Sequence, residues 1–141
     1  MLTTQLIHPP LLAALAAAGH GSKVLIADSN YPHATAHGPN AEVVHLNVSR
    51  GLVNGTDTLA AIASVITIES AAVMAPGDEF LSVHEEYREL LGADVPVTIM
   101  ERFAFYEACR GNDLALLVAT GEDRIYANLL LTIGVAPAPA N

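Results

Sequence analysis

Residues 11–28 read LLAALAAAGHGSKVLIAD, an alanine-rich apolar segment that ends at a glycine and leads into a short apolar run. Two prolines precede the segment and Gly19 follows it, which is typical of the start and the end of a helix. The run from Val24 to Ala27 is apolar without alternation, as in a strand buried on both faces. We therefore expect a helix over 11–18, a strand over 24–27 and Asp28 at the tip of that strand.

The rest of the chain alternates between strand and helix patterns. We expect Asp57 to cap one helix, and Ser82 and Glu85 to form the capping box of the next. This alternation predicts one α/β domain with a sheet covered by helices, or an antiparallel element formed by the last two strands. Strands are expected at 42–47, 71–75, 97–100, 114–119 and 125–133, helices at 57–68, 82–92 and 103–109, and a frayed tail at about 136–141.

Composition narrows the class of protein. Hydrophobic residues make up 52% of the chain and the mean hydropathy is +0.39, yet the apolar segment 11–18 is too short to span a bilayer. We interpret the surplus of hydrophobic residues as a sign that the chain forms a subunit interface. The net charge of −9 would repel a phosphate backbone, so nucleic acid is not an expected partner, and the short apolar segments do not predict a membrane partner. The lone Cys109, expected in the core, and the lack of a basic leader indicate a cytoplasmic protein.

Short polar segments interrupt this apolar chain and supply candidate site residues. His20, between Gly19 and Gly21, either caps the preceding helix or exchanges protons with a ligand. Asp28 either bonds its own backbone in a turn or accepts from a ligand in the crevice at the end of a strand. Each residue thus has a structural and a functional interpretation.

The second half of the chain adds two polar pairs. Tyr126 and Asn128 lie two apart on an expected strand, so they share a face, where they either meet solvent or bond adjacent hydroxyls of a polyol. Arg102 and Tyr106 lie four apart and are neighbours on a helix, with surface packing as the alternative. Together with His20 and Asp28, these residue types predict a sugar site.

Three histidines raise the question of a metal. His33 and His37 have a spacing that suits a metal site only on a helix, and Pro32, Gly38 and Pro39 oppose a helix there. Ala34 stands where a zinc-protease motif requires a glutamate, and His45 adds no ligand spacing. We therefore expect no metal at these histidines, and a metal-dependent hydrolase is the weakest of the hypotheses.

The order of these motifs resembles the bacterial L-fucose mutarotase and D-ribose pyranase family over nearly the whole chain. The hexapeptide 102–107 looks like that of the L-fucose branch, whereas Asn30 departs from a histidine that many members of this branch carry. The motifs are Gly19-His20-Gly21, Asp28 with Asn30-Tyr31-Pro32, Arg102-Phe103-Ala104-Phe105-Tyr106-Glu107, Thr120-Gly121-Glu122 and Tyr126-Ala127-Asn128.

The resemblance implies a fold, an activity and roles for residues. It implies a single three-layer α/β domain with a central, mostly parallel sheet flanked by helices, and a decameric ring whose sites are completed by a neighbouring subunit. The implied activity is interconversion of the α and β anomers of L-fucose, with D-ribose pyranase or a non-catalytic sugar-binding ring as alternatives. The resemblance implies no metal and no organic cofactor. The implied catalytic residues are His20 and Tyr106, and the implied sugar-binding residues are Asp28, Glu69, Arg102, Tyr126 and Asn128.

Overall fold

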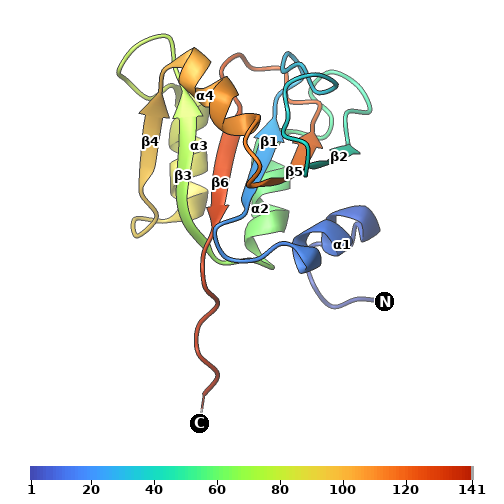
Figure 1. Ribbon diagram of the computed structural model, residues 1–141. Helices are drawn as coiled ribbons and strands as arrows, with labels where there is room; N and C mark the ends of the chain where they lie inside the picture. Colours follow the sequence, from blue (N-terminus) through green and yellow to red (C-terminus); the bar gives the residue numbers. More distant parts are fainter. Residues whose placement is uncertain (141) are drawn as a thin grey trace.

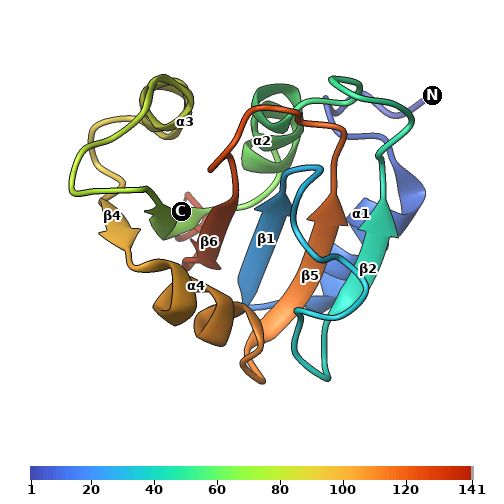
Figure 2. The ribbon, with the colours of Figure 1, turned by 90° about the horizontal axis from the view of Figure 1, so that it is seen from above.

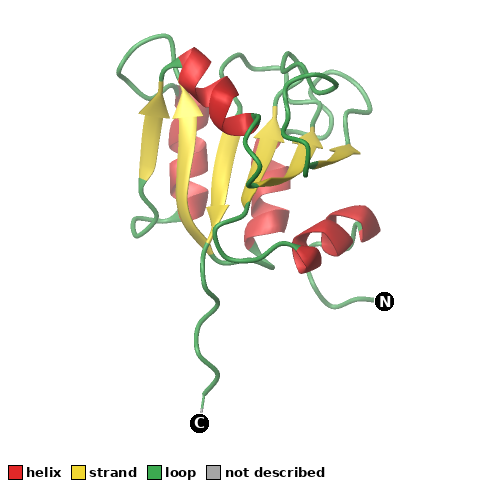
Figure 3. Ribbon diagram, in the orientation of Figure 1, coloured by secondary structure: helices red, strands yellow, loops and turns green. Residues whose placement is uncertain are grey.

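The structure is a computed structural model that describes residues 1–140, and within them it contains one six-stranded sheet and four helices. The strands lie in the order β2-β5-β1-β6-β3-β4 (Figure 1). They are β1 (Lys23–Ala27), β2 (Glu42–His45), β3 (Ile68–Met74), β4 (Val97–Met100), β5 (Leu114–Ala119) and β6 (Leu129–Ile133). The helices, red in Figure 3, are α1 (Pro9–Ala17), α2 (Gly55–Ala63), α3 (Ser82–Leu91) and α4 (Arg102–Cys109).

The sheet is mostly parallel. β1 pairs in parallel with β5, β5 with β2, and β3 with β4, whereas β6 runs antiparallel to both β1 and β3. The last two strands do not pair with each other, because β1 lies between them. The connection from β5 to β6 contains no helix, so the chain cannot return for a parallel crossover, and β6 runs back down the sheet.

Two hydrophobic cores lie on the two faces of the sheet, which confirms the three-layer architecture (Figure 2). Val24 and Ile26 of β1 pack with α1, α2 and α3, while Leu25 and Ala27 face α4 and the loop after β1. Cys109 is fully buried in this second core, as expected, and burial raises the pKa of its thiol to about 11. The sheet is thus a rigid base for whatever lies at its edges.

Several predicted boundaries of helices were wrong. Asn54, not Asp57, caps α2, and its side chain accepts a hydrogen bond from the Asp57 N–H at 2.8 Å. The helix ends at Ala63, where residues 64 and 65 close a turn with i→i−3 backbone hydrogen bonds, and β3 begins at Ile68. Leu81 caps α3, and the His84 ring, instead of a Ser82 and Glu85 box, accepts from its N–H at 2.9 Å.

The last strand starts later in the sequence than predicted. β6 begins at Leu129, because Tyr126 has a φ of 57° and turns the chain away from an extended course. Residues 135–140 are exposed and belong to no helix or strand. None of the helices described in residues 1–140 is long and apolar enough to cross a membrane.

Candidate functional site

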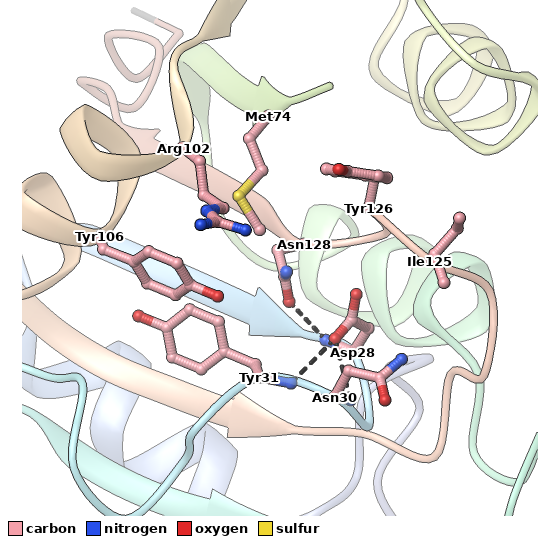
Figure 4. A pocket seen from close by; sticks show the side chains of 9 residues that line it. All are labelled: Asp28, Asn30, Tyr31, Met74, Arg102, Tyr106, Ile125, Tyr126 and Asn128. Carbon is pink, nitrogen blue, oxygen red and sulfur yellow. Dashed lines mark hydrogen bonds between the residues drawn. The ribbon is translucent and has the colours of Figure 1, made fainter. Parts of the chain in front are cut away.

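A pocket of about 450 Å³ opens beside the carboxyl end of β1, where Figure 4 shows its wall. It brings together five of the residues predicted for the site, from three places in the sequence: the tip of β1, the first turns of α4 and the segment before β6. The lining residues are Asp28, Asn30, Tyr31, Met74, Arg102, Tyr106, Ile125, Tyr126 and Asn128.

Asp28 organises the floor of the pocket. Its side chain accepts hydrogen bonds from the backbone N–H groups of Asn30 and Tyr31, each at 3.0 Å, and of Ala127 at 3.1 Å. Burial raises the pKa of this carboxyl above its ordinary value, although the three donors oppose the shift. Asp28 therefore forms the predicted turn and also offers a remaining lone pair at the pocket wall.

Asn128 lies against Asp28 and has a fixed orientation. Its Oδ1 accepts from the Asp28 N–H at 2.7 Å, drawn as a dashed line in Figure 4. The amide nitrogen then remains as a donor on the side of Arg102 and Met74. Tyr126 lies two residues before Asn128, in a turn and not on the strand that the sequence predicted.

Arg102 and Tyr106 project from α4 into the same space. The helix begins here because the Glu101 carboxylate accepts from the N–H groups of Phe103 and Ala104, at 3.0 and 3.1 Å. Figure 4 shows the Tyr106 hydroxyl pointing into the pocket. The pair therefore lines the pocket, and Arg102, which is exposed, also packs over the Phe103 ring at 5.0 Å, as the surface-packing alternative expects.

Four lining residues were not predicted as site residues. Asn30 and Tyr31 follow Asp28 directly, so their place in the turn was the signal that could have found them. Met74 ends β3 and is 5% exposed, and Ile125 is 65% exposed at the rim. Met74 and Ile125 add apolar side chains to the lining of the pocket.

His20 and Glu69 do not line this pocket. They lie at the other end of the sheet, where His20 Nε2 and Glu69 Oε2 are 3.2 Å apart and both side chains are exposed, at 59% and 45%. β1 alone separates the two ends by about 15 Å, at about 3.3 Å per residue. Within one copy of the chain, the predicted proton donor is therefore remote from the predicted sugar-binding residues.

The other histidines have structural contacts. His33 Nε2 lies 2.7 Å from the Asp28 carbonyl oxygen, and the rings of His33 and His45 meet edge to face at 6.4 Å. Within residues 1–140, no three His, Cys, Asp or Glu side chains are grouped closely enough to hold a metal ion. His33 instead braces the turn that Asp28 forms.

A pocket of sugar size, lined by polar and apolar side chains at the strand ends of a mostly parallel sheet, is typical of α/β proteins that bind small molecules. The RbsD / FucU transport protein family model matches residues 1–136. The chain belongs to this family, which confirms the resemblance drawn from its motifs.

Individual relatives are similar over most of their length. A fucose mutarotase from Danio rerio is 35% identical over an alignment of 144 positions, which covers 93% of this chain and 90% of that protein. The structure of FucU from Bifidobacterium longum is 35% identical, with a TM-score of 0.76, over 92% of this chain and 96% of that one. The fucose mutarotase of Streptococcus pneumoniae, solved with L-fucose, is 28% identical, with a TM-score of 0.75, over 93% and 95%.

Proposed function

We propose that this protein is a mutarotase that interconverts the α and β anomers of L-fucose. The observation that carries the proposal is the convergence of a carboxylate, an amide, a guanidinium and two phenols on one pocket. Similarity to fucose mutarotases over nearly the whole chain supports L-fucose as the sugar. The chain has 141 residues and a single cysteine, and it relies on no internal disulfide, which fits a cytoplasmic enzyme.

The reaction needs two proton transfers and no redox step. A proton reaches the ring oxygen while another leaves the anomeric hydroxyl, so the bond between C1 and the ring oxygen breaks and the free aldehyde forms. Rotation about the C1–C2 bond presents the other carbonyl face, and reclosure returns both protons. One positioned acid or base contributes about a hundredfold to ten-thousandfold to such a step.

The pocket residues divide between binding and proton transfer. The Asn128 amide donates to one sugar hydroxyl, and the Asp28 carboxylate accepts from another. Arg102 binds a sugar oxygen without losing its own proton. Tyr126 binds a hydroxyl beside them, and Tyr106 exchanges a proton with the sugar through its phenol.

The apolar residues in the pocket lining suit a deoxy sugar. L-fucose carries a methyl group where most hexoses carry a hydroxymethyl group, and Met74 offers a flexible thioether that packs against such a group. D-ribose has no group of this kind. The contrast favours L-fucose over D-ribose at this site.

A neighbouring copy of the chain completes the site in our proposal. His20 exchanges a proton with the sugar bound by the next subunit, and Glu69 at 3.2 Å orients its ring. Phe103 and Ile125 are 69% and 65% exposed beside the pocket, and burial of these apolar side chains would favour association at this edge. A closed ring, with ten subunits as the family resemblance implies, repeats this contact at every site.

Exchange NMR on the anomeric protons of L-fucose, with D-ribose in parallel, tests the function. We expect the protein to accelerate α to β exchange of L-fucose more than that of D-ribose. His20→Ala should lose most of the acceleration while retaining the native assembly. Binding of L-fucose without acceleration would leave a non-catalytic sugar-binding ring, and a preference for D-ribose would make the protein a ribose pyranase.

A further inference from the structure

Helix α3 contributes two buried polar side chains that bond to the backbone of the pocket wall. His84 and Tyr87 are both fully buried. His84 Nε2 donates to the Tyr126 carbonyl oxygen at 2.7 Å, and the Tyr87 hydroxyl donates to the Ala127 carbonyl oxygen, also at 2.7 Å. They belong to α3, which lies on the face of the sheet opposite α4 (Figure 2), so the pocket wall is bonded from the layer opposite Arg102 and Tyr106.

The hydrogen bonds of His84 determine its tautomer. Its Nδ1 accepts from the Leu81 N–H at 2.9 Å, so Nδ1 carries no proton and the neutral ring has its proton on Nε2. That proton points at Tyr126. Burial lowers the pKa of His84, against smaller raising effects of the Tyr126 bond and of Glu85. The ring is therefore a fixed bridge between the start of α3 and the pocket wall.

Tyr126 needs such a support because of its backbone conformation. Its φ of 57° lies in the left-handed region, which is unfavourable for a residue with a side chain. Three successive backbone groups are held there: the Tyr126 carbonyl by His84, the Ala127 N–H by Asp28 and the Ala127 carbonyl by Tyr87. Together these three hydrogen bonds stabilise the turn that directs Tyr126 and Asn128 into the pocket.

We propose that His84 is a positioning residue for anomer exchange, whose Nε2–H holds the Tyr126 carbonyl and thereby sets Tyr126 and Asn128 against the sugar. The proposal rests on the proposed mutarotase function, and His84 itself does not line the pocket. Misplacement of a binding group by about 1 Å can reduce an enzymatic rate by about a hundredfold. A small movement of Tyr126 is therefore enough to change activity.

Two amide substitutions separate the two bonds of the ring. The side-chain nitrogen of His84→Gln lies near the position of Nε2 and keeps a donor for Tyr126, but the variant loses the acceptor for Leu81. The side-chain oxygen of His84→Asn lies near the position of Nδ1 and keeps the Leu81 bond, but the variant loses the donor for Tyr126. Each variant loses one buried bond, so thermal unfolding should show a similar loss of stability in both.

Activity should follow the Tyr126 bond. We expect kcat/KM for L-fucose exchange to fall no more than about threefold in His84→Gln and at least about tenfold in His84→Asn, because only the latter releases the turn. Equal losses in the two variants, or losses that follow Tm alone, would overturn the positioning role. Wild-type protein without exchange activity would instead refute the mutarotase function. The affinity for L-fucose would then test the positioning role: it should fall more in His84→Asn than in His84→Gln, and equal losses would overturn the role.

A measurement on the unmodified protein covers the case in which a variant fails to fold. Nitrogen-15 NMR of the histidine rings reports which nitrogen carries the proton. We expect His84 to show a protonated Nε2 in slow exchange with water and an unprotonated Nδ1. A proton on Nδ1, or rapid exchange at Nε2, would contradict the bridge.

Discussion

Two tyrosines at the pocket show how one residue type takes two roles. The rings of Tyr31 and Tyr106 lie 5.3 Å apart. The Tyr31 hydroxyl points away from the pocket and donates to the Ala36 carbonyl oxygen at 2.6 Å, whereas the Tyr106 hydroxyl points into the pocket (Figure 4). Burial raises the pKa of Tyr31 above its ordinary range, so its phenol does not exchange protons near neutral pH.

Removal of the Tyr106 hydroxyl should therefore reduce activity, whereas removal of the Tyr31 hydroxyl should reduce stability. Tyr106→Phe should reduce L-fucose exchange by at least about a hundredfold, since it removes a proton-transfer group, and should leave stability nearly unchanged. Tyr31→Phe should cost about 1–3 kcal/mol of unfolding free energy, because the buried Ala36 carbonyl loses its donor, with little effect on exchange. Urea unfolding and exchange NMR measure the two effects. Loss of activity in Tyr31→Phe alone would contradict these assignments.

The pocket residues that could be predicted from the sequence are those with a signal in the neighbouring sequence. Asp28 follows an unambiguous buried strand, and Arg102 and Tyr106 share a helical spacing. Tyr126 and Asn128 were expected on a strand, and their true turn depends on bonds from α3, about 40 residues away in the sequence. His84 carries no local signal of its role, because its partner is a backbone carbonyl.

At the scale of elements, helix caps show where sequence patterns mislead. Strands β4 and β5 have the predicted bounds, because their apolar runs are short and bounded by turn residues. Helix α2 begins at Gly55 instead of Asp57, since the Asn54 side chain accepts from the Asp57 N–H. Two residues that both favour caps stand near one helix start, and the sequence alone does not rank them.

Substitution of the two residues should reveal which one caps the helix. Asn54→Ala should cost about 1 kcal/mol of unfolding free energy, because the first turn loses its side-chain acceptor. Asp57→Ala should cost at most about half as much, since it removes only a favourable charge near the helix dipole. Chemical denaturation compares the two. A larger loss for Asp57→Ala would contradict the observed cap.

The link from α3 to the pocket wall should make stability depend on pH. His84 has an ordinary pKa of about 6.5 in the unfolded chain and a lower one in the folded chain. As the pH falls below about 6.5, the unfolded chain takes up a proton that the folded chain does not, so this residue makes stability fall with the pH. His84→Gln should therefore lose less Tm than wild type between about pH 7.5 and 5.5.

A matched control removes the other bond of the same helix. Tyr87→Phe deletes the donor to the Ala127 carbonyl without deleting a group that titrates between these pH values. Its Tm should be lower than that of wild type at both pH values, with the pH dependence of wild type retained. A pH dependence in His84→Gln equal to that of wild type would show that His84 is not the group responsible.

At the scale of the whole molecule, the separation of His20 from the pocket is the main feature. The strand predicted over 24–27 already places His20 and Asp28 at opposite ends. The sequence does not show that the other pocket residues gather at the end that carries Asp28. That arrangement follows from strand direction: His20 precedes β1 and Asp28 follows it. A site that uses both residues requires two copies of the chain, which agrees with the apolar surplus of the composition.

Complementation between inactive variants tests this account most directly. His20→Ala keeps an intact pocket and Tyr106→Phe keeps an intact His20, so a mixed assembly places both intact parts at some subunit contacts. Exchange NMR on L-fucose should show that equal co-expression of the two variants recovers up to about a quarter of wild-type activity, since random assembly pairs the intact parts at one contact in four. Activity no greater than the average of the two separate variants would contradict a site shared between subunits.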